Sequence, residues 1–198
     1  ASGLQSIMDG YRAIAVGEGS VYLSGGVESM SRAPFVLAKA ESAFSRNAEI
    51  YDTTIGWRFP NPQLSALHHP YSMGETAENV AKKWDISREA QDDFAFESQQ
   101  KYFRALAANK WKEEILPVEI KLGKNEMKIF DQDEHPRNSP REKLAALKPA
   151  FDKNGTVTAG NSSGINDGAA MLILVAESVV KKHQLKPMAR IVSSAIAG

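Results

Sequence analysis

The chain opens with apolar residues that recur every three or four positions until Gly17 interrupts them. This period predicts an amphipathic helix that begins almost at the first residue. Its apolar positions are Leu4, Ile7, Met8, Tyr11, Ile14 and Ala15. The next apolar stretch, residues 20–24, is typical of a short strand, and the glycine pair at 25–26 indicates a loop after it. The opening order is therefore helix, strand and glycine-containing loop.

The middle of the chain has an irregular part and a strongly helical part. Between residues 36 and 71 the periodicity disappears and prolines interrupt the chain, although aromatic and aliphatic side chains remain. We expect an irregular but packed excursion there. Helical spacing returns over residues 75–84, and Ser87 is a suitable N-cap for a longer helix that ends near Asn109.

Short elements follow the long helix. Residues 115–120 and 128–130 are predicted strands, the first with a proline that favours an edge or a bulge. Ser139, Pro140 and Glu142 have the spacing of a capping box, with the serine as N-cap and the proline as first helical residue. A small helix is therefore expected to start there.

Residues 155–170 read GTVTAGNSSGINDGAA, in which four glycines stand among small hydroxyl and amide side chains. Such a loop can bring bare backbone close to an anionic or amide-rich ligand, but glycine-rich loops are as often simple turns. The loop feeds the apolar run 171–175, a predicted buried strand, and a helix over 177–183 and a strand over 190–195 follow. Helices and strands alternate at both ends, which is typical of a parallel or mixed α/β sheet.

The composition narrows the function classes. In 198 residues, Lys plus Arg and Asp plus Glu both number 24, so no net field attracts nucleic acid or an anionic membrane. The absence of cysteine removes disulfides and any cysteine nucleophile within these residues. No apolar stretch is long enough for a membrane span, and a cytoplasmic setting is expected.

Few polar residues point to chemistry by themselves. None of the four histidines has metal-site spacing, so no metal is expected. Glu28 and Glu78 flank apolar helical positions, and we expect exposed or capping roles in preference to buried carboxylates. Arg137 follows an acidic run, and two interpretations stay open for it, a surface ion pair or a phosphate contact near the glycine-rich loop.

Six ordered segments together resemble the thiolase family, the acyl-CoA:acetyl-CoA C-acyltransferases. They are ASGLQ at 1–5, GGVESMSRAP at 25–34, SMGETAENVA at 72–81, ISREAQDDFAFESQ at 86–99, EEILPV at 113–118 and KPAFDKNGTVTAGNSSGINDGAA at 148–170. The stretch AEIYDTTIGWRF, at 48–59, together with SMGETAENVA, further resembles the branch that cleaves 3-oxoadipyl-CoA and related 3-oxoacyl-CoA esters.

The resemblance implies an α/β fold of layered αβαβα type. Residues 1–35 and 159–198 would belong to the N-terminal half, and residues 36–158 would form an inserted loop domain. It also implies a homodimer or homotetramer.

The implied activity is transfer of an acyl group between an enzyme cysteine and coenzyme A or acetyl-CoA. In the family the nucleophilic cysteine lies immediately before the ASGLQ-type sequence, so its position would precede Ala1 and the chain alone would be inactive. The family's catalytic histidine and second cysteine belong to later motifs, so their positions would follow Gly198. Two alternatives stay open, a noncatalytic CoA-binding or assembly module, and a segment that folds only with a partner half.

The resemblance also implies a binding site for coenzyme A, as a substrate and not a permanently bound cofactor. The implied contacts are Arg137 and Leu147 for the nucleotide, Ala150 and Phe151 for adenine and pantetheine, Ala159, Ser163 and Gly164 for pantetheine, and Met73 for the acyl end. Ser72 stands where the short-chain biosynthetic branch often has histidine, which argues against strict acetoacetyl-CoA specificity.

Overall fold

The computed structural model describes residues 2–40, 42–124 and 126–196. The chain divides into two compact units, one made of residues 1–54 and 165–198 and the other of residues 55–164. The domain boundaries expected near residues 35 and 158 remain predictions. Ala1 and Gly198, the residues that border the expected catalytic positions, lie outside the described residues.

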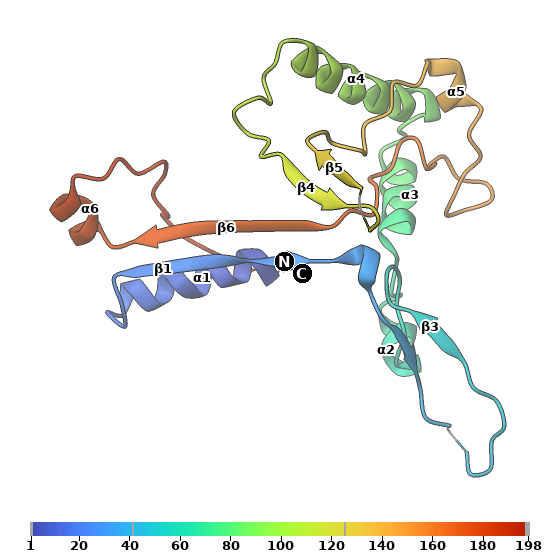
Figure 1. Ribbon diagram of the computed structural model, residues 1–198. Coiled ribbons are helices and arrows are strands. Elements are labelled where there is room, and N and C mark those ends of the chain that lie inside the picture. The colour runs from blue at the N-terminus through green and yellow to red at the C-terminus, as the bar shows by residue number, and fades with distance from the viewer. Residues whose placement is uncertain (1, 41, 125, 197–198) are drawn as a thin grey trace. The chain divides into compact units, whose positions relative to one another are not determined.

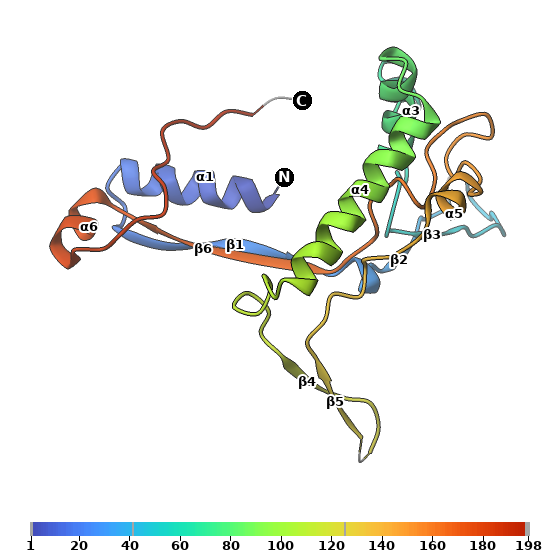
Figure 2. The ribbon, with the colours of Figure 1, turned by 90° about the horizontal axis from the view of Figure 1, so that it is seen from above.

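The first unit is built on a pair of antiparallel strands from opposite ends of the chain. β1 (Val21–Glu28) pairs with β6 (Gly168–Val175) along its whole length, and α1 (Ser2–Ala15) lies along the pair (Figures 1 and 2). The helix predicted at the start is confirmed. Gly10 allows its close approach, because a Cβ there would lie 2.9 Å from Cδ1 of Leu174.

The strand pair is longer than its sequence pattern indicates. The predicted loop at Gly25 and Gly26 is wrong, since β1 continues through both to Glu28. Gly25 pairs with Met171, and a Cβ at Gly25 would collide with the backbone of Ala170. The glycines therefore serve close strand pairing, and they do not end the strand.

The apolar run in β6 is not buried within this chain. Leu23 and Ile173 are opposite each other in the register, and they are 70% and 66% exposed. Their face of the pair is the one that α1 does not cover, because α1 packs on the face with Tyr22 and Leu174. The pairing is also antiparallel, whereas the alternation of elements favoured a parallel or mixed sheet.

Smaller elements complete the first unit: η1 (Met30–Arg32), the hairpin of β2 (Phe35–Leu37) and β3 (Ile50–Asp52), and α6 (Glu177–His183). α6 confirms the predicted helix, and its last turn carries the basic side chains that favour a helix C-terminus. The strand predicted over 190–195 is wrong. These residues are irregular, because no strand in the described part of the chain pairs with them.

A short polar contact joins η1 to the residue that precedes β6. The N–H and Oγ–H of Ser31 donate to the carboxylate of Asp167 at 2.9 and 2.6 Å. These donors, the hydroxyl first, hold the pKa of Asp167 below its ordinary value.

We expect this contact to make stability depend on pH in the acid range. Because the pKa of Asp167 is lower in the folded state, its stabilisation is complete above the unfolded-state pKa and is lost as the pH falls through the folded-state value. Denaturant titrations across the acid range should show a smaller acid loss in Asp167→Asn than in the unmodified protein. An unchanged pH profile would show that the contact does not persist in solution.

The second unit contains most of the helices. These are α2 (Pro62–Leu67), α3 (Met73–Lys83), α4 (Arg88–Ala107) and α5 (Arg141–Ala145), and the strands β4 (Val118–Lys121) and β5 (Met127–Phe130) form an antiparallel hairpin. The helices predicted over 75–84 and after Ser87 are confirmed, with Ser87 Oγ accepting the N–H of Ala90. The strand predicted over 128–130 is confirmed, and the one predicted over 115–120 is confirmed only from Val118, after the proline. α2 was not predicted, although Asn61 caps it and Pro62 is its first residue.

The capping box predicted at Ser139 is wrong. Pro140 itself has the extended backbone of an N-cap, so α5 begins at Arg141 and no side chain caps it. The displacement by one residue takes the Ser139 hydroxyl out of register with the first N–H groups of the helix. No helix in the described part of the chain is long and apolar enough to cross a bilayer.

Candidate functional site

The site begins at the first turn of α3, where a reciprocal capping box fixes the chain. Ser72 Oγ accepts the N–H of Glu75 at 3.2 Å, and Glu75 Oε2 accepts the N–H of Ser72 at 2.7 Å. Donation by this backbone N–H lowers the pKa of Glu75. The box makes Met73 the first helical residue, with a side chain that is 80% exposed, and Gly74 the second.

The ring of Phe151 lies directly over Gly74. Gly74 is buried, and a Cβ built there would overlap Cδ1 and Cγ of the ring. The absent side chain is what lets the ring approach the helix. One edge of Phe151 remains open, since the residue is 41% exposed. Phe151 and Met73 therefore flank the same first turn of α3.

We expect Gly74→Ala to displace this ring. Helix propensity would favour alanine by up to about 1 kcal/mol, but overpacking against a fixed ring costs about 1–3 kcal/mol. Chemical denaturation should therefore show a net loss of about 1 kcal/mol. Gly123→Ala is the matched control, because a Cβ there meets nothing within 4 Å. Equal stability of the two variants would contradict the packing described.

The carboxylate of Glu78, one turn further along α3, holds the start of the glycine-rich loop. Oε1 accepts the N–H of Thr156 at 2.9 Å and that of Val157 at 2.7 Å, and Oε2 accepts the Thr156 hydroxyl at 3.2 Å. Gly155 leaves room for this carboxylate, since a Cβ there would overlap Oε1. The exposed or capping role expected for Glu78 is wrong.

Polar side chains of the loop also form hydrogen bonds within the loop. Asn161 Oδ1 accepts the N–H of Thr158 at 2.7 Å, and its Nδ2 donates to the carbonyl of Thr156 at 3.1 Å. Thr158 is fully buried, its Oγ1 accepts the N–H of Gly160 at 3.1 Å, and its carbonyl accepts the Ser162 hydroxyl at 2.7 Å. These hydrogen bonds satisfy backbone groups within residues 156–162 and restrain the conformation of the loop.

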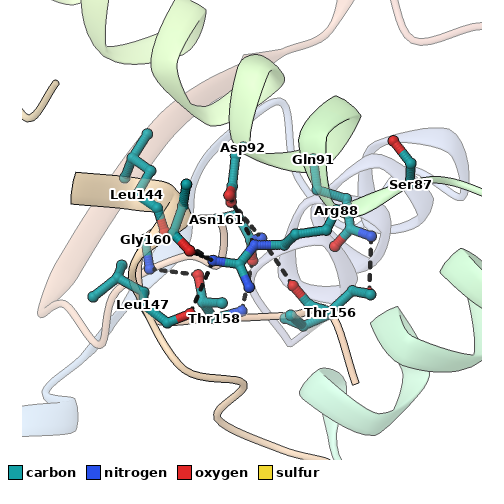
Figure 3. A network of polar contacts seen from close by, with 12 residues as sticks. Ser87, Arg88, Gln91, Asp92, Leu144, Leu147, Thr156, Thr158, Gly160 and Asn161 are labelled. Carbon is teal, nitrogen blue, oxygen red and sulfur yellow. Dashed lines mark hydrogen bonds and ion pairs between the residues drawn. The ribbon is translucent and has the colours of Figure 1, made fainter. Parts of the chain in front are cut away.

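An ion pair at the start of α4 joins this loop to α5 (Figure 3). Arg88 Nε donates to Asp92 Oδ2 at 2.8 Å, and the other carboxylate oxygen accepts Asn161 Nδ2 at 2.9 Å. Arg88 NH2 donates to the carbonyls of Leu144, near the end of α5, and of Leu147, just after it, at 2.8 and 3.0 Å. The side chains of Arg88 and Asp92 are 21% and 10% exposed.

Apolar packing also holds the loop against α5, in addition to the polar contacts. A Cβ at Gly160 would lie 2.6 Å from Leu147 and 2.8 Å from Leu144, so only glycine fits there without movement. The N–H of Ala150 donates to the carbonyl of Val157 at 2.9 Å beside a bridge between Pro149 and Thr158. The result is a hydrogen-bonded wall of backbone with an aromatic ring at one end.

Most residues implied as coenzyme A contacts fall on this wall. Phe151 and Met73 flank α3, Leu147 is half-buried beside Gly160, and Ala150 is on the bridged ladder. The remaining ones from the loop, Ala159, Ser163 and Gly164, are exposed, and no hydrogen bond occupies the Ser163 hydroxyl among the described residues.

Arg137 does not join the wall through any hydrogen bond of the described residues. Its N–H donates to Gln99 Oε1 at 2.8 Å, and its NH1 donates to the carbonyls of Glu134, His135 and Pro136. The surface ion pair, one of the two interpretations left open for it, is absent from the described part of the chain. Its exposed guanidinium keeps further donors for another acceptor.

The positions expected for the catalytic groups fall beyond both ends of the described chain. The cysteine nucleophile would precede Ala1, and the histidine and second cysteine would follow Gly198. Since both end residues lie outside the described residues, these expectations stay predictions.

The sequence did not indicate four residues that shape the site: Glu78, Arg88, Asp92 and Asn161. For Glu78 a signal existed, because Gly74, Glu78 and Ala81 are spaced by four and three and so share a helix face. A carboxylate between two small buried residues on a helix face predicts a polar partner from elsewhere. Within the described residues, no group of histidines and carboxylates has the arrangement of a metal site.

A model of the thiolase N-terminal domain matches residues 1–178. The chain belongs to the thiolase family. Among its relatives is the beta-ketoadipyl-CoA thiolase of Pseudomonas putida, 52% identical over 199 residues that cover 100% of this chain and 50% of that protein. The thiolase-family chain thus spans about half the length of the curated relatives it matches.

Solved thiolase structures share its fold. The acetyl-CoA acetyltransferase of Bacillus anthracis matches with a TM-score of 0.77 at 38% identity, over 94% of this chain and 46% of that one. Human mitochondrial 3-ketoacyl-CoA thiolase in complex with CoA matches with a TM-score of 0.76 at 40% identity, over 94% and 45%. The expected thiolase-like α/β fold is confirmed.

Proposed function

We propose that this chain supplies the coenzyme A-binding wall of a thiolase that cleaves or forms 3-oxoacyl-CoA esters. The observation that carries the proposal is the rigid loop 156–162, which Glu78 and Asn161 hold beside Phe151. A long, flexible pantetheine arm loses less freedom on a surface that is already fixed, and its amides need hydrogen-bonding groups. The exposed Ser163 hydroxyl is one such group.

The coenzyme A contacts follow from this wall. The exposed edge of Phe151 packs beside adenine and pantetheine together with Ala150, and Ala159 and Gly164 leave the backbone open along pantetheine. Arg137 and Leu147 lie on the nucleotide side, where the remaining donors of the guanidinium suit a phosphate. Met73 lies at the acyl end.

In the reaction, the bond between C2 and C3 of a 3-oxoacyl-CoA breaks after a cysteine thiolate attacks C3. C2 takes a proton and leaves as acetyl-CoA, and the acyl group becomes a thioester of the cysteine. The thiol of a second coenzyme A then takes the acyl group and returns the cysteine. Since the 198 residues contain no cysteine, their part is to bind and orient the coenzyme A esters. The dimer or tetramer and the cytoplasmic location stay predictions.

The protein at the length its gene encodes should release acetyl-CoA from 3-oxohexanoyl-CoA and free coenzyme A, measured by chromatography of the products. Phe151→Ala should raise the KM for coenzyme A about tenfold, since it removes a large aromatic contact, while Phe94→Ala on the exposed surface of α4 serves as the control. Binding of coenzyme A without any turnover would favour a noncatalytic CoA-binding module instead. If the protein neither binds coenzyme A nor turns over the substrate, both the thiolase function and the CoA-binding module are wrong.

A further inference from the structure

The segment 55–59 lies beside the start of α3 through one side-chain hydrogen bond. Trp57 Nε1–H donates to the carbonyl of Tyr71 at 3.2 Å, one residue before the capping box of α3. The backbone of the segment is tightly turned, with positive φ at Gly56 (83°) and at Phe59 (50°). Arg58 is thereby held next to an anchored indole, in the same unit as Met73.

Arg58 is a partly buried cation. Its NH1 donates to the carbonyl of Gly56, and no ion pair to Arg58 occurs among the described residues. Removing a guanidinium from water is costly unless an anion and further hydrogen bonds compensate. A planar guanidinium with free donors in this setting suits a carboxylate, which it can bind through two parallel hydrogen bonds.

The acidic residue in the first turn of α3 is already occupied. Glu75 is turned back onto the N–H of Ser72, and His69 Nε2 lies 4.0 Å from its other oxygen. His69 and Glu75 therefore balance each other when the imidazole is protonated, whereas Arg58, next to Trp57 in sequence, has no ion-pair partner among the described residues. An acyl chain whose CoA thioester lies along the glycine-rich loop would direct its far end toward Met73.

We propose that Arg58 binds the free terminal carboxylate of a dicarboxylic 3-oxoacyl-CoA and so selects for such substrates. This inference rests on the proposed function, which places the acyl end at Met73. The beta-ketoadipyl group named for the relative at 52% identity ends in such a carboxylate once its other end is a thioester. Trp57 and Tyr71 act as positioning residues, because their hydrogen bond fixes the segment that carries the guanidinium.

The test compares two substrates of equal chain length in the protein as its gene encodes it. 3-Oxoadipyl-CoA and 3-oxohexanoyl-CoA differ only in a terminal carboxylate against a methyl group. Arg58→Gln should lower kcat/KM for 3-oxoadipyl-CoA about 30-fold relative to 3-oxohexanoyl-CoA, since it removes a charge-assisted pair. Arg58→Lys should recover part of that ratio, and Arg104→Gln, an exposed position on α4, should leave it unchanged.

The outcomes separate the two levels of inference. An unchanged ratio in Arg58→Gln, with either equal losses or no losses for both substrates, overturns the carboxylate site and leaves the thiolase function intact. No thiolysis of either substrate by the unmodified protein overturns the proposed function and the carboxylate site together. Thermal unfolding of each variant shows whether an equal loss comes from a folding defect.

Discussion

Arg88→Met is expected to destabilise the protein by about 3 kcal/mol, because it leaves a nearly buried carboxylate without its cation. Among the described residues, Asp92 would keep the Asn161 amide as its hydrogen-bond partner, and the carbonyls of Leu144 and Leu147 would lose the guanidinium donor. Methionine preserves much of the side-chain volume, so the effect reports the lost charge and hydrogen bonds more than a cavity. Denaturant unfolding gives the free energy, and the KM for coenzyme A should rise because α5 and the loop are no longer joined.

A double-mutant cycle with Asp92→Asn isolates the ion pair from its other contacts. The two single variants should lose more in sum than the double variant loses, since each single change leaves one unpaired charge. Arg104→Met on the exposed side of α4 is the matched control and should lie within about 0.5 kcal/mol of the unmodified protein. Additive losses would mean that Arg88 and Asp92 do not form the pair in solution.

Glu78→Ala is expected to release the glycine-rich loop and to cost about 2–3 kcal/mol, since hydrogen bonds to a charged group are strong and the freed N–H groups are partly buried. The N–H groups concerned are those of Thr156 and Val157, and the latter residue is only 4% exposed. Hydrogen exchange at these two amides should accelerate together with the fall in unfolding free energy. The KM for coenzyme A should increase more than kcat changes, because the wall along pantetheine is lost.

Two further variants show whether loss of the Glu78 carboxylate itself causes the fall in stability. Glu78→Gln keeps one acceptor oxygen and should lose only about half as much stability as Glu78→Ala. Glu119→Ala, on the exposed hairpin strand β4, removes the same side chain at a position where the described residues show no hydrogen bond to it. Unchanged amide exchange at Thr156 and Val157 in Glu78→Ala would refute the contact.

Apart from α2, the helices could be predicted because their signals are local. The period of apolar residues in α1 and α3 and the serine N-cap of α4 act over one or two turns, so no knowledge of distant partners is needed. The resemblance to thiolases depended on ordered segments, and the family comparison confirms it.

The parts that could not be predicted depend on distant segments. The partners of the Glu78 carboxylate are Thr156 and Val157, which are far along the chain, so its own helix gives only a weak indication. Ser139 has the right spacing for a cap, but the backbone of Pro140 takes that position. The apolar run in β6 predicts burial, yet burial needs a covering layer, and α1 covers one face only.

The pairing of β1 with β6 has a consequence for the order of folding. Leu23 and Ile173 pair across a loop that contains all of residues 55–164. The chain loses the conformational entropy of closing this long loop before any strand contact compensates for it. Prior formation of the compact second unit shortens the effective loop. The two strands are therefore expected to pair late, and a nascent chain would present Val21–Glu28 as an unpaired edge until the last part of this sequence has been synthesised.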